Sequence, residues 1–91
     1  MKINFNTSFS IALEKQIKYI SKDSVFYAKR FKEELLLKIK EIPKNPLIYR
    51  KSIYFEDENI RDLIFKGYTI VFRIDTDTVQ VFGFIKQQNS L

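Results

Sequence analysis

The sequence contains no cysteine and no histidine among its 91 residues. The absence of cysteine excludes a disulfide framework and a cysteine nucleophile. Because histidine is absent as well, a zinc finger and a Ser-His-Asp triad are also excluded. Glycine and proline number two each, which excludes long irregular, collagen-like and low-complexity segments. The absence of histidine also excludes a His-based acid–base pair.

Long apolar runs are also missing. The N-terminal segment MKINFNTSFS has no apolar core of the kind that a signal peptide carries. The longest apolar run near the C-terminus, residues 81–85 with one glycine inside it, is far too short to span a bilayer. We therefore expect a cytoplasmic protein with no membrane partner.

The length and the apolar content are those of one small folded unit. Apolar residues make up 45 % of the chain and aromatic residues 15 %, with nine Phe and five Tyr. A disordered segment is poor in aromatic residues, so this composition excludes a disordered tail. We expect a single domain over residues 1–91 with one modest core.

The charge is positive and unevenly distributed. The net charge is +5, and residues 1–45 hold ten basic and five acidic side chains, whereas residues 46–91 hold six of each. A small basic protein suits an acidic partner, either nucleic acid, the ribosome or an acidic protein. The alternative is that the lysines are solvated side chains on helix surfaces and contact no ligand.

The first twenty residues carry a strand pattern followed by a helix pattern. Polar and apolar side chains alternate over Lys2–Phe5, which predicts a short strand. Thr7 or Ser8 then provides a helix cap, and apolar residues recur at helical spacing over residues 8–21. The apolar stripe of this helix comprises Phe9, Leu13, Ile17 and Ile20.

A second helix pattern follows a capping signal at Asp23 and Ser24. Its apolar stripe is about five turns long and comprises Ala28, Phe31, Leu35, Ile39 and Ile42. Pro43 and Pro46 stop the helix, because proline lacks an amide hydrogen and restricts the preceding residue. The joint at residues 22–23 is so short that the two helices must form an antiparallel hairpin.

The second half of the chain changes to a strand period. Strands are predicted at Ile60–Phe65, Tyr68–Ile74 and 78–85, joined by tight connections at residues 66–67 and 75–77. Gly67 supplies the positive φ that such a turn requires, and Tyr68 leads the inward row of its strand. The fold class is therefore α+β: an N-terminal strand, an antiparallel helix hairpin and a three-stranded antiparallel meander (βααβββ), with the hairpin on one face of the sheet.

The meander also carries family-like motifs. The segments NIRDL at residues 59–63 and KGYTIVFRI at residues 66–74 resemble the core of the RelE/ParE superfamily, the toxins of bacterial type II toxin–antitoxin systems. The element order agrees with this resemblance over nearly the whole chain. The resemblance implies a growth-inhibiting toxin of the plasmid-stabilisation kind, with a cognate acidic antitoxin as partner and no cofactor. It also implies one of two targets, which are DNA gyrase for ParE-like members and messenger RNA on the ribosome for RelE-like members.

Metal-free RNA cleavage needs a base, a cation that holds the phosphate, and an acid for the leaving oxygen. The resemblance places Arg61 at the phosphate-binding position of the family, and Arg73 and Lys86 complete the candidate set of catalytic or target-contacting residues. The tail at residues 87–91 contains no Tyr, His or acidic residue. Possible substitutes for the proton-transfer groups are Tyr49, Tyr54 and Glu56, although nothing in their spacing places them beside Arg61.

Each candidate residue also has a structural alternative. Arg61 can pair with the acidic run at residues 56–58 or with an antitoxin carboxylate, and Arg73 can pair across the sheet with Asp62. Lys86 can be a solvated lysine at a strand end. Because the tail lacks His and Tyr, the sequence favours a ParE-like toxin that binds and blocks gyrase through its basic helix hairpin or its meander. The alternative is a ribosome-dependent endoribonuclease that uses Arg61, Arg73 and Lys86. A DNA-binding module is a weaker interpretation, because no helix-turn-helix signal is present.

Overall fold

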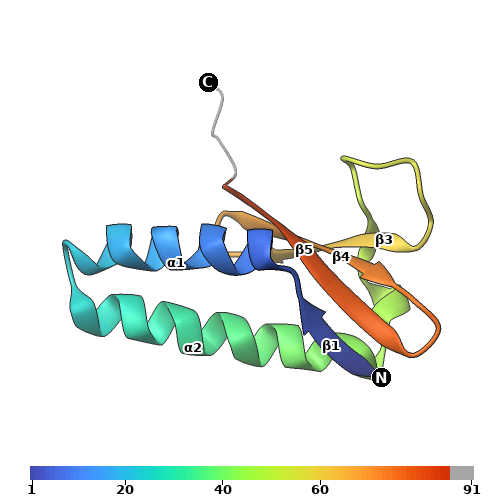
Figure 1. Cartoon of the computed structure of the whole chain (residues 1–91), viewed down its shortest axis with the longest axis horizontal. Helices are drawn as coiled ribbons and strands as arrows, with labels where there is room; N and C mark the ends of the chain where they lie inside the picture. Colours follow the sequence, from blue (N-terminus) through green and yellow to red (C-terminus); the bar gives the residue numbers. More distant parts are fainter. Residues whose placement is uncertain (87–91) are drawn as a thin grey trace.

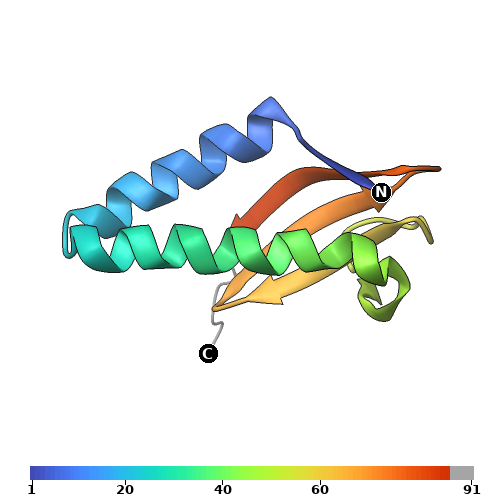
Figure 2. The same cartoon turned by 90° about the horizontal axis from the view of Figure 1, so that it is seen from below.

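A helix hairpin lies on one face of a twisted five-stranded sheet in the computed structural model, which describes residues 1–86 (Figures 1 and 2). This arrangement confirms the predicted α+β class and the order strand, two helices, strands. The elements in chain order are β1 (Lys2–Phe5), α1 (Thr7–Ser21), α2 (Val25–Glu41), the short 3-10 turns η1 (Ile42–Lys44) and η2 (Pro46–Ile48), β2 (Arg50–Lys51), β3 (Ile60–Phe65), β4 (Tyr68–Ile74) and β5 (Thr78–Lys86).

The helix hairpin begins one residue earlier than the sequence predicts. Helix α1 starts at Thr7, so Asn6 precedes it as the capping residue and its side chain makes no capping bond. The second cap is confirmed, because the Ser24 hydroxyl accepts a hydrogen bond of 3.0 Å from the Tyr27 amide. Helix α2 gives way to the 3-10 turn η1, which contains Pro43, as the proline signal predicts.

The sheet has the strand order β1-β5-β4-β3-β2. Strand β1 pairs in parallel with β5, so Lys2 lies opposite Thr78, whereas all other neighbouring strands are antiparallel. Strand β2 was not predicted, and it makes the sheet five-stranded. It pairs Arg50 with Asp62 and Lys51 with Arg61. Two residues are too few to show alternation, so the sequence pattern carried no sign of this strand.

Two local features shape the meander. Lys66 and Gly67 have φ angles of 47° and 84°, the positive values that a tight two-residue hairpin turn needs, which confirms the prediction for Gly67. A bulge interrupts the β4–β5 pair, because Phe72 lies opposite Val81 but Val71 lies opposite Gly83. A Cβ atom on Gly83 would lie 2.8 Å from the Cβ atom of Val71, so only glycine fits there.

The core lies between the helix hairpin and the sheet. The Phe31 ring meets the rings of Phe65 and Tyr68 edge-on, at centroid distances of 5.4 and 5.3 Å. Tyr68 is buried, as predicted, and the apolar stripe of α2 is buried along its whole length. The cluster comprises Phe9, Leu13, Phe31, Leu35, Ile39, Ile42, Leu63, Phe65, Tyr68, Ile70, Phe72, Val79 and Val81.

The opposite face of the sheet is partly covered by the loop at residues 52–59, which we call the 52–59 loop. The Phe55 ring meets the Phe82 ring at 5.6 Å, and the Ile53 amide donates to the Asp62 carboxylate. Val71, which pairs with Asp62 on this face, is buried. The helices therefore cover one face of the sheet, and this loop covers part of the other. Within residues 1–86, no helix is long and apolar enough to cross a membrane.

Candidate functional site

Arg61 lies on β3, and its guanidinium donates hydrogen bonds to backbone carbonyls rather than to a carboxylate. Its Nε donates to the Glu58 carbonyl at 2.8 Å, and its Nη1 donates to the Tyr49 carbonyl at 3.0 Å. These bonds tie the end of the 52–59 loop to the segment before β2. The contact with the acidic run is thus made to the main chain of Glu58, whose carboxylate pairs with Lys51 instead. Arg61 has a positioning role in the described structure.

Arg73 lies on the other face of the sheet. It pairs with Ile60 on β3 and with Gln80 on β5, and its side chain is exposed. It lines a shallow hollow whose walls are Asn6, Arg73, Asp75, Gln80 and Phe82. No ion pair of Arg73 is formed within residues 1–86, because Asp62, the carboxylate expected to pair with it, pairs with Arg50. Arg73 is therefore a cation available to a partner.

Lys86 lies at the far end of β5. It is the cross-strand neighbour of Tyr68, and its ammonium nitrogen lies 5.9 Å from the centre of the Tyr19 ring at the end of α1. Its charge is thus placed against an aromatic ring at the end of the helix hairpin, which is a favourable cation–π contact.

The structure does not bring the three predicted residues together. Arg61 and Arg73 project from opposite faces, because Arg61 pairs with Phe72 and Arg73 is the next residue of β4. Lys86 pairs with Tyr68, four residues along β4 from Phe72, which separates it from Arg61 by roughly 13 Å of strand. A single scissile phosphate cannot contact all three side chains.

Of the three substitutes considered for proton transfer, Tyr49 lies beside Arg61, because its carbonyl accepts the hydrogen bond from Arg61 Nη1. The Tyr49 ring packs edge-on against Phe72 at 5.5 Å, and burial raises its pKa above the ordinary value of 10.0. A raised pKa makes Tyr49 a weaker acid near neutral pH. Tyr54 and Glu56 lie in the 52–59 loop, where both side chains are exposed. No group of carboxylates that could hold a metal ion is found in the part of the chain that the structure describes.

Asp62 is the buried charge that sequence reasoning missed. Its side chain is fully buried, and its Oδ2 accepts hydrogen bonds from Arg50 Nε at 3.2 Å and from the Ile53 amide at 3.2 Å. Arg50 Nη2 completes the ion pair at 3.1 Å. Because a buried carboxylate is stable only when it is paired, this contact fixes β2 and the start of the 52–59 loop on the sheet.

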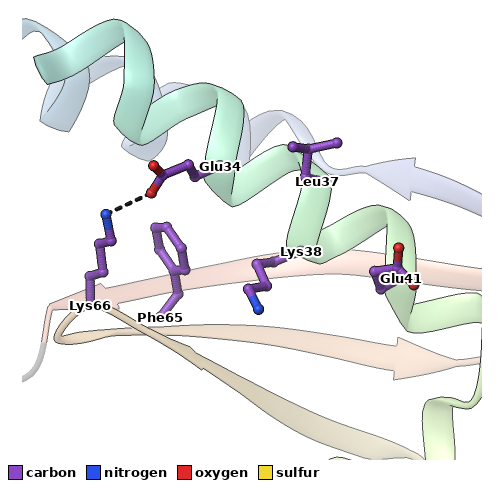
Figure 3. Close-up of a pocket in the computed structure, with 6 residues that line it drawn as sticks. All are labelled: Glu34, Leu37, Lys38, Glu41, Phe65 and Lys66. Carbon is purple, nitrogen blue, oxygen red and sulfur yellow. Dashed lines mark hydrogen bonds and ion pairs between the residues drawn. The ribbon is translucent and has the colours of Figure 1, made fainter.

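A groove runs between α2 and the edge of the sheet (Figure 3). Its walls are Glu34, Leu37, Lys38, Glu41, Phe65 and Lys66. The Lys66 ammonium bridges the groove to the Glu34 carboxylate at 2.6 Å, while Phe65 lies between the helix and the strand. Strand β2 pairs only with Arg61 and Asp62, so in the described chain β3 from residue 63 onward is an open sheet edge beside this groove.

The Glu34 carboxylate is the most strongly held group of the groove. The hydrogen bond from Lys66 lowers its pKa below the ordinary value of 4.5, and a second bond from Arg30 acts in the same direction. Glu34 therefore stays ionised and neutralises part of the positive charge at this side of the molecule.

Comparisons with known proteins agree with this architecture. Residues 3–91 match the family model described as the ParE toxin of the type II toxin–antitoxin system parDE. The fold also resembles a chain of the solved structure titled "Chromosomal ParDE TA system from P. aeruginosa", with a TM-score of 0.78 over 97 % of both chains. The two sequences are 12 % identical, so this likeness concerns the fold. No curated protein sequence matches the chain.

Proposed function

The chain belongs to the ParE toxin family of type II toxin–antitoxin systems, and from this premise we propose that it arrests growth by binding and blocking DNA gyrase. The observation that carries the proposal is the separation of Arg61, Arg73 and Lys86. Metal-free RNA cleavage needs proton-transfer groups and a cation around one phosphate. A toxin that acts by binding needs only a surface that fits its target. The family and the exposed positive charge support the second mode of action.

The three predicted residues take different roles in this proposal. Arg61 positions the 52–59 loop through its two carbonyl contacts. Arg73 and Lys86 are exposed cations, and each is available for a contact with the target. No metal and no small-molecule cofactor takes part.

We also propose that the partner is an acidic antitoxin, which the family and the ParDE title suggest. The groove beside α2 supports an antitoxin partner, because Leu37 and Phe65 give it apolar walls and, in the described chain, the edge of β3 beside it is open. Its two lysines, Lys38 and Lys66, are balanced by Glu34 and Glu41, so the acidic character of the antitoxin is argued from the charge of the whole chain. An extended antitoxin segment can add a strand to the open edge of β3 and lay its apolar side chains into the groove. Its carboxylates would then neutralise part of the +5 charge.

The whole of residues 1–91 acts as one toxin domain in this proposal. Strand β1 pairs with β5, and helix α1 packs on β5 as well. The two ends of the described chain therefore belong to one folded unit.

Two assays on the same chain test the proposal. Purified DNA gyrase should lose supercoiling activity when the toxin is added, and induced cells should arrest growth with intact messages. Messenger RNA 5′ ends should be mapped within minutes of induction as the second readout. New ends inside coding regions, in ribosome register, would contradict the proposal and identify an endoribonuclease. Arg73→Ala is a suitable companion variant, since a nuclease that uses Arg73 would lose those ends.

A further inference from the structure

The end of the helix hairpin carries the most exposed aromatic side chains of the described chain. We call this region the hairpin tip: the last turn of α1, the joint, and the first turns of α2, over residues 18–30. Figures 1 and 2 show that both helices extend past the end of the strands at the tip. The exposed fractions are 60 % for Tyr19, 73 % for Val25, 72 % for Phe26 and 49 % for Tyr27. Large apolar patches on a small protein mark interaction sites.

Cations surround these apolar side chains. The Arg30 guanidinium lies 6.0 Å from the centre of the Phe26 ring, and the Lys66 ammonium lies 6.0 Å from that of Tyr27. Lys86 lies over Tyr19 in the same way. Within residues 1–86, six cations belong to the tip or lie against it, with only two carboxylates, Asp23 and Glu34, among them; the cations are Lys18, Lys22, Lys29, Arg30, Lys66 and Lys86. Most of the excess charge of the chain is therefore gathered at one end.

We propose that the hairpin tip is the surface with which the toxin binds its target, and that the target presents an acidic protein surface with an apolar recess for Val25 and Phe26. This proposal deepens the proposed function and rests on it. Aromatic side chains and arginine dominate the binding energy of protein interfaces when they enter a desolvated pocket. The surrounding lysines attract an acidic surface and accelerate encounter.

A protein surface fits the tip better than a nucleic acid does. Stacking of bases needs free aromatic faces, but cations already lie near one face of the Tyr19, Phe26 and Tyr27 rings. Val25, the most exposed of the four, has no ring and offers nothing to a base. A second copy of this chain is a poor occupant as well, because two positively charged tips repel each other.

A matched pair of double variants tests the proposal. The tip variant is Val25→Ser with Phe26→Ser, and the control is Leu47→Ser with Ile48→Ser in the 3-10 turn η2, where the exposed fractions are 66 % and 70 %. The concentration that halves gyrase supercoiling should rise about tenfold or more for the tip variant and change by less than about twofold for the control. Growth arrest at matched expression should follow the same order, and circular dichroism should show both variants folded.

Each other outcome has a definite meaning. Full activity of the folded tip variant would overturn the proposal. Equal losses in both variants would also overturn it, since the contact would then not be localised at the tip. If the wild-type toxin arrests growth without inhibiting gyrase, the gyrase assignment fails and the tip is judged by growth arrest alone. Tight binding of a single-stranded oligonucleotide that the tip variant loses would replace the acidic protein surface by nucleic acid.

Discussion

The hairpin tip and the 52–59 loop both expose large apolar side chains, but they differ in what holds them and in their charge. The loop exposes Ile53, Tyr54 and Phe55 beside three carboxylates. Two hydrogen bonds fix it to the sheet: the Ile53 amide donates to the Asp62 carboxylate, and the Arg61 guanidinium donates to the Glu58 carbonyl. The tip exposes its apolar side chains beside cations, and its helices extend past the ends of the strands. Substitutions in the loop anchors should therefore cost stability, whereas substitutions at the tip should cost activity.

The largest expected effect on stability is at the loop's buried anchor. Asp62→Ala removes a fully buried carboxylate and leaves Arg50 and the Ile53 amide without their acceptor. The free energy of unfolding should fall by about 2–3 kcal/mol, as expected for a broken buried ion pair with one partly exposed partner. Urea denaturation measures the change, with Asp75→Ala as an exposed carboxylate control. Equal midpoints for Asp62→Ala and wild type would show that the loop is not held through this residue.

Arg61→Ala should produce the next largest effect. It removes two hydrogen bonds to backbone carbonyls, so the unfolding free energy should fall by about 1–2 kcal/mol and the loop should become more sensitive to proteases. Lys32→Ala is the control, because Lys32 makes only an exposed ion pair with Glu14. Toxicity should fall more for Arg61→Ala than for Lys32→Ala. Equal effects on stability and on toxicity would contradict the positioning role.

The turn that carries Lys66 to the tip offers a smaller test. Gly67 has a φ of 84° and open space around it, so Gly67→Ala adds backbone strain without a clash. The expected loss is about 1 kcal/mol, or roughly 4–8 °C in melting temperature for a domain of this size. Gly67→Asn should lose less, since asparagine tolerates the left-handed region. An identical melting temperature for wild type and Gly67→Ala would show that the turn adopts a different conformation.

The tip variant should barely change stability. Because Val25 and Phe26 are largely exposed, their replacement by serine should alter the unfolding free energy by less than about 0.5 kcal/mol. Thermal denaturation provides the measurement. If the tip variant lost as much unfolding free energy as Asp62→Ala, the side chains of the tip would contribute to the folded core. The proposed difference between the tip and the loop would then be wrong.

The smallest expected effect is on pH dependence beside the tip. The pKa of Glu34 is lowered by Lys66 and then by Arg30, so its ionised form is favoured in the folded state. Its contribution to stability is present above the ordinary value of 4.5 and is lost as the pH falls through the lowered pKa. The difference in melting temperature between wild type and Glu34→Gln should therefore shrink below that pH. A constant difference from pH 7 to pH 3 would contradict the ion pair.

The fold was largely predictable from the sequence because each side-chain row repeats with the period of its element. The stripe of α2 and the row that begins at Tyr68 identify the buried faces, and the Lys66-Gly67 pair identifies the turn. Strand β2 and the contacts of Arg61 were not predictable in the same way. Strand β2 is only two residues long, and Arg61 donates a hydrogen bond to a carbonyl twelve residues away in the sequence. Neither feature produces a periodic pattern of apolar side chains. The tip did leave a signal, because Val25, Phe26 and Tyr27 are consecutive and a helix can bury only part of such a run.

The parallel pairing of β1 with β5 has a consequence for synthesis. Residues 5 and 78 are made roughly 4–15 seconds apart at typical translation rates of about 5–20 residues per second. During that interval the helix hairpin can form, but the apolar stripe of α2 has no sheet to pack against. Strand β1 likewise waits for its only neighbour in the described sheet. The nascent toxin therefore completes its core only after its last described strand has left the ribosome, and until then the apolar stripe of α2 lacks the sheet that buries it.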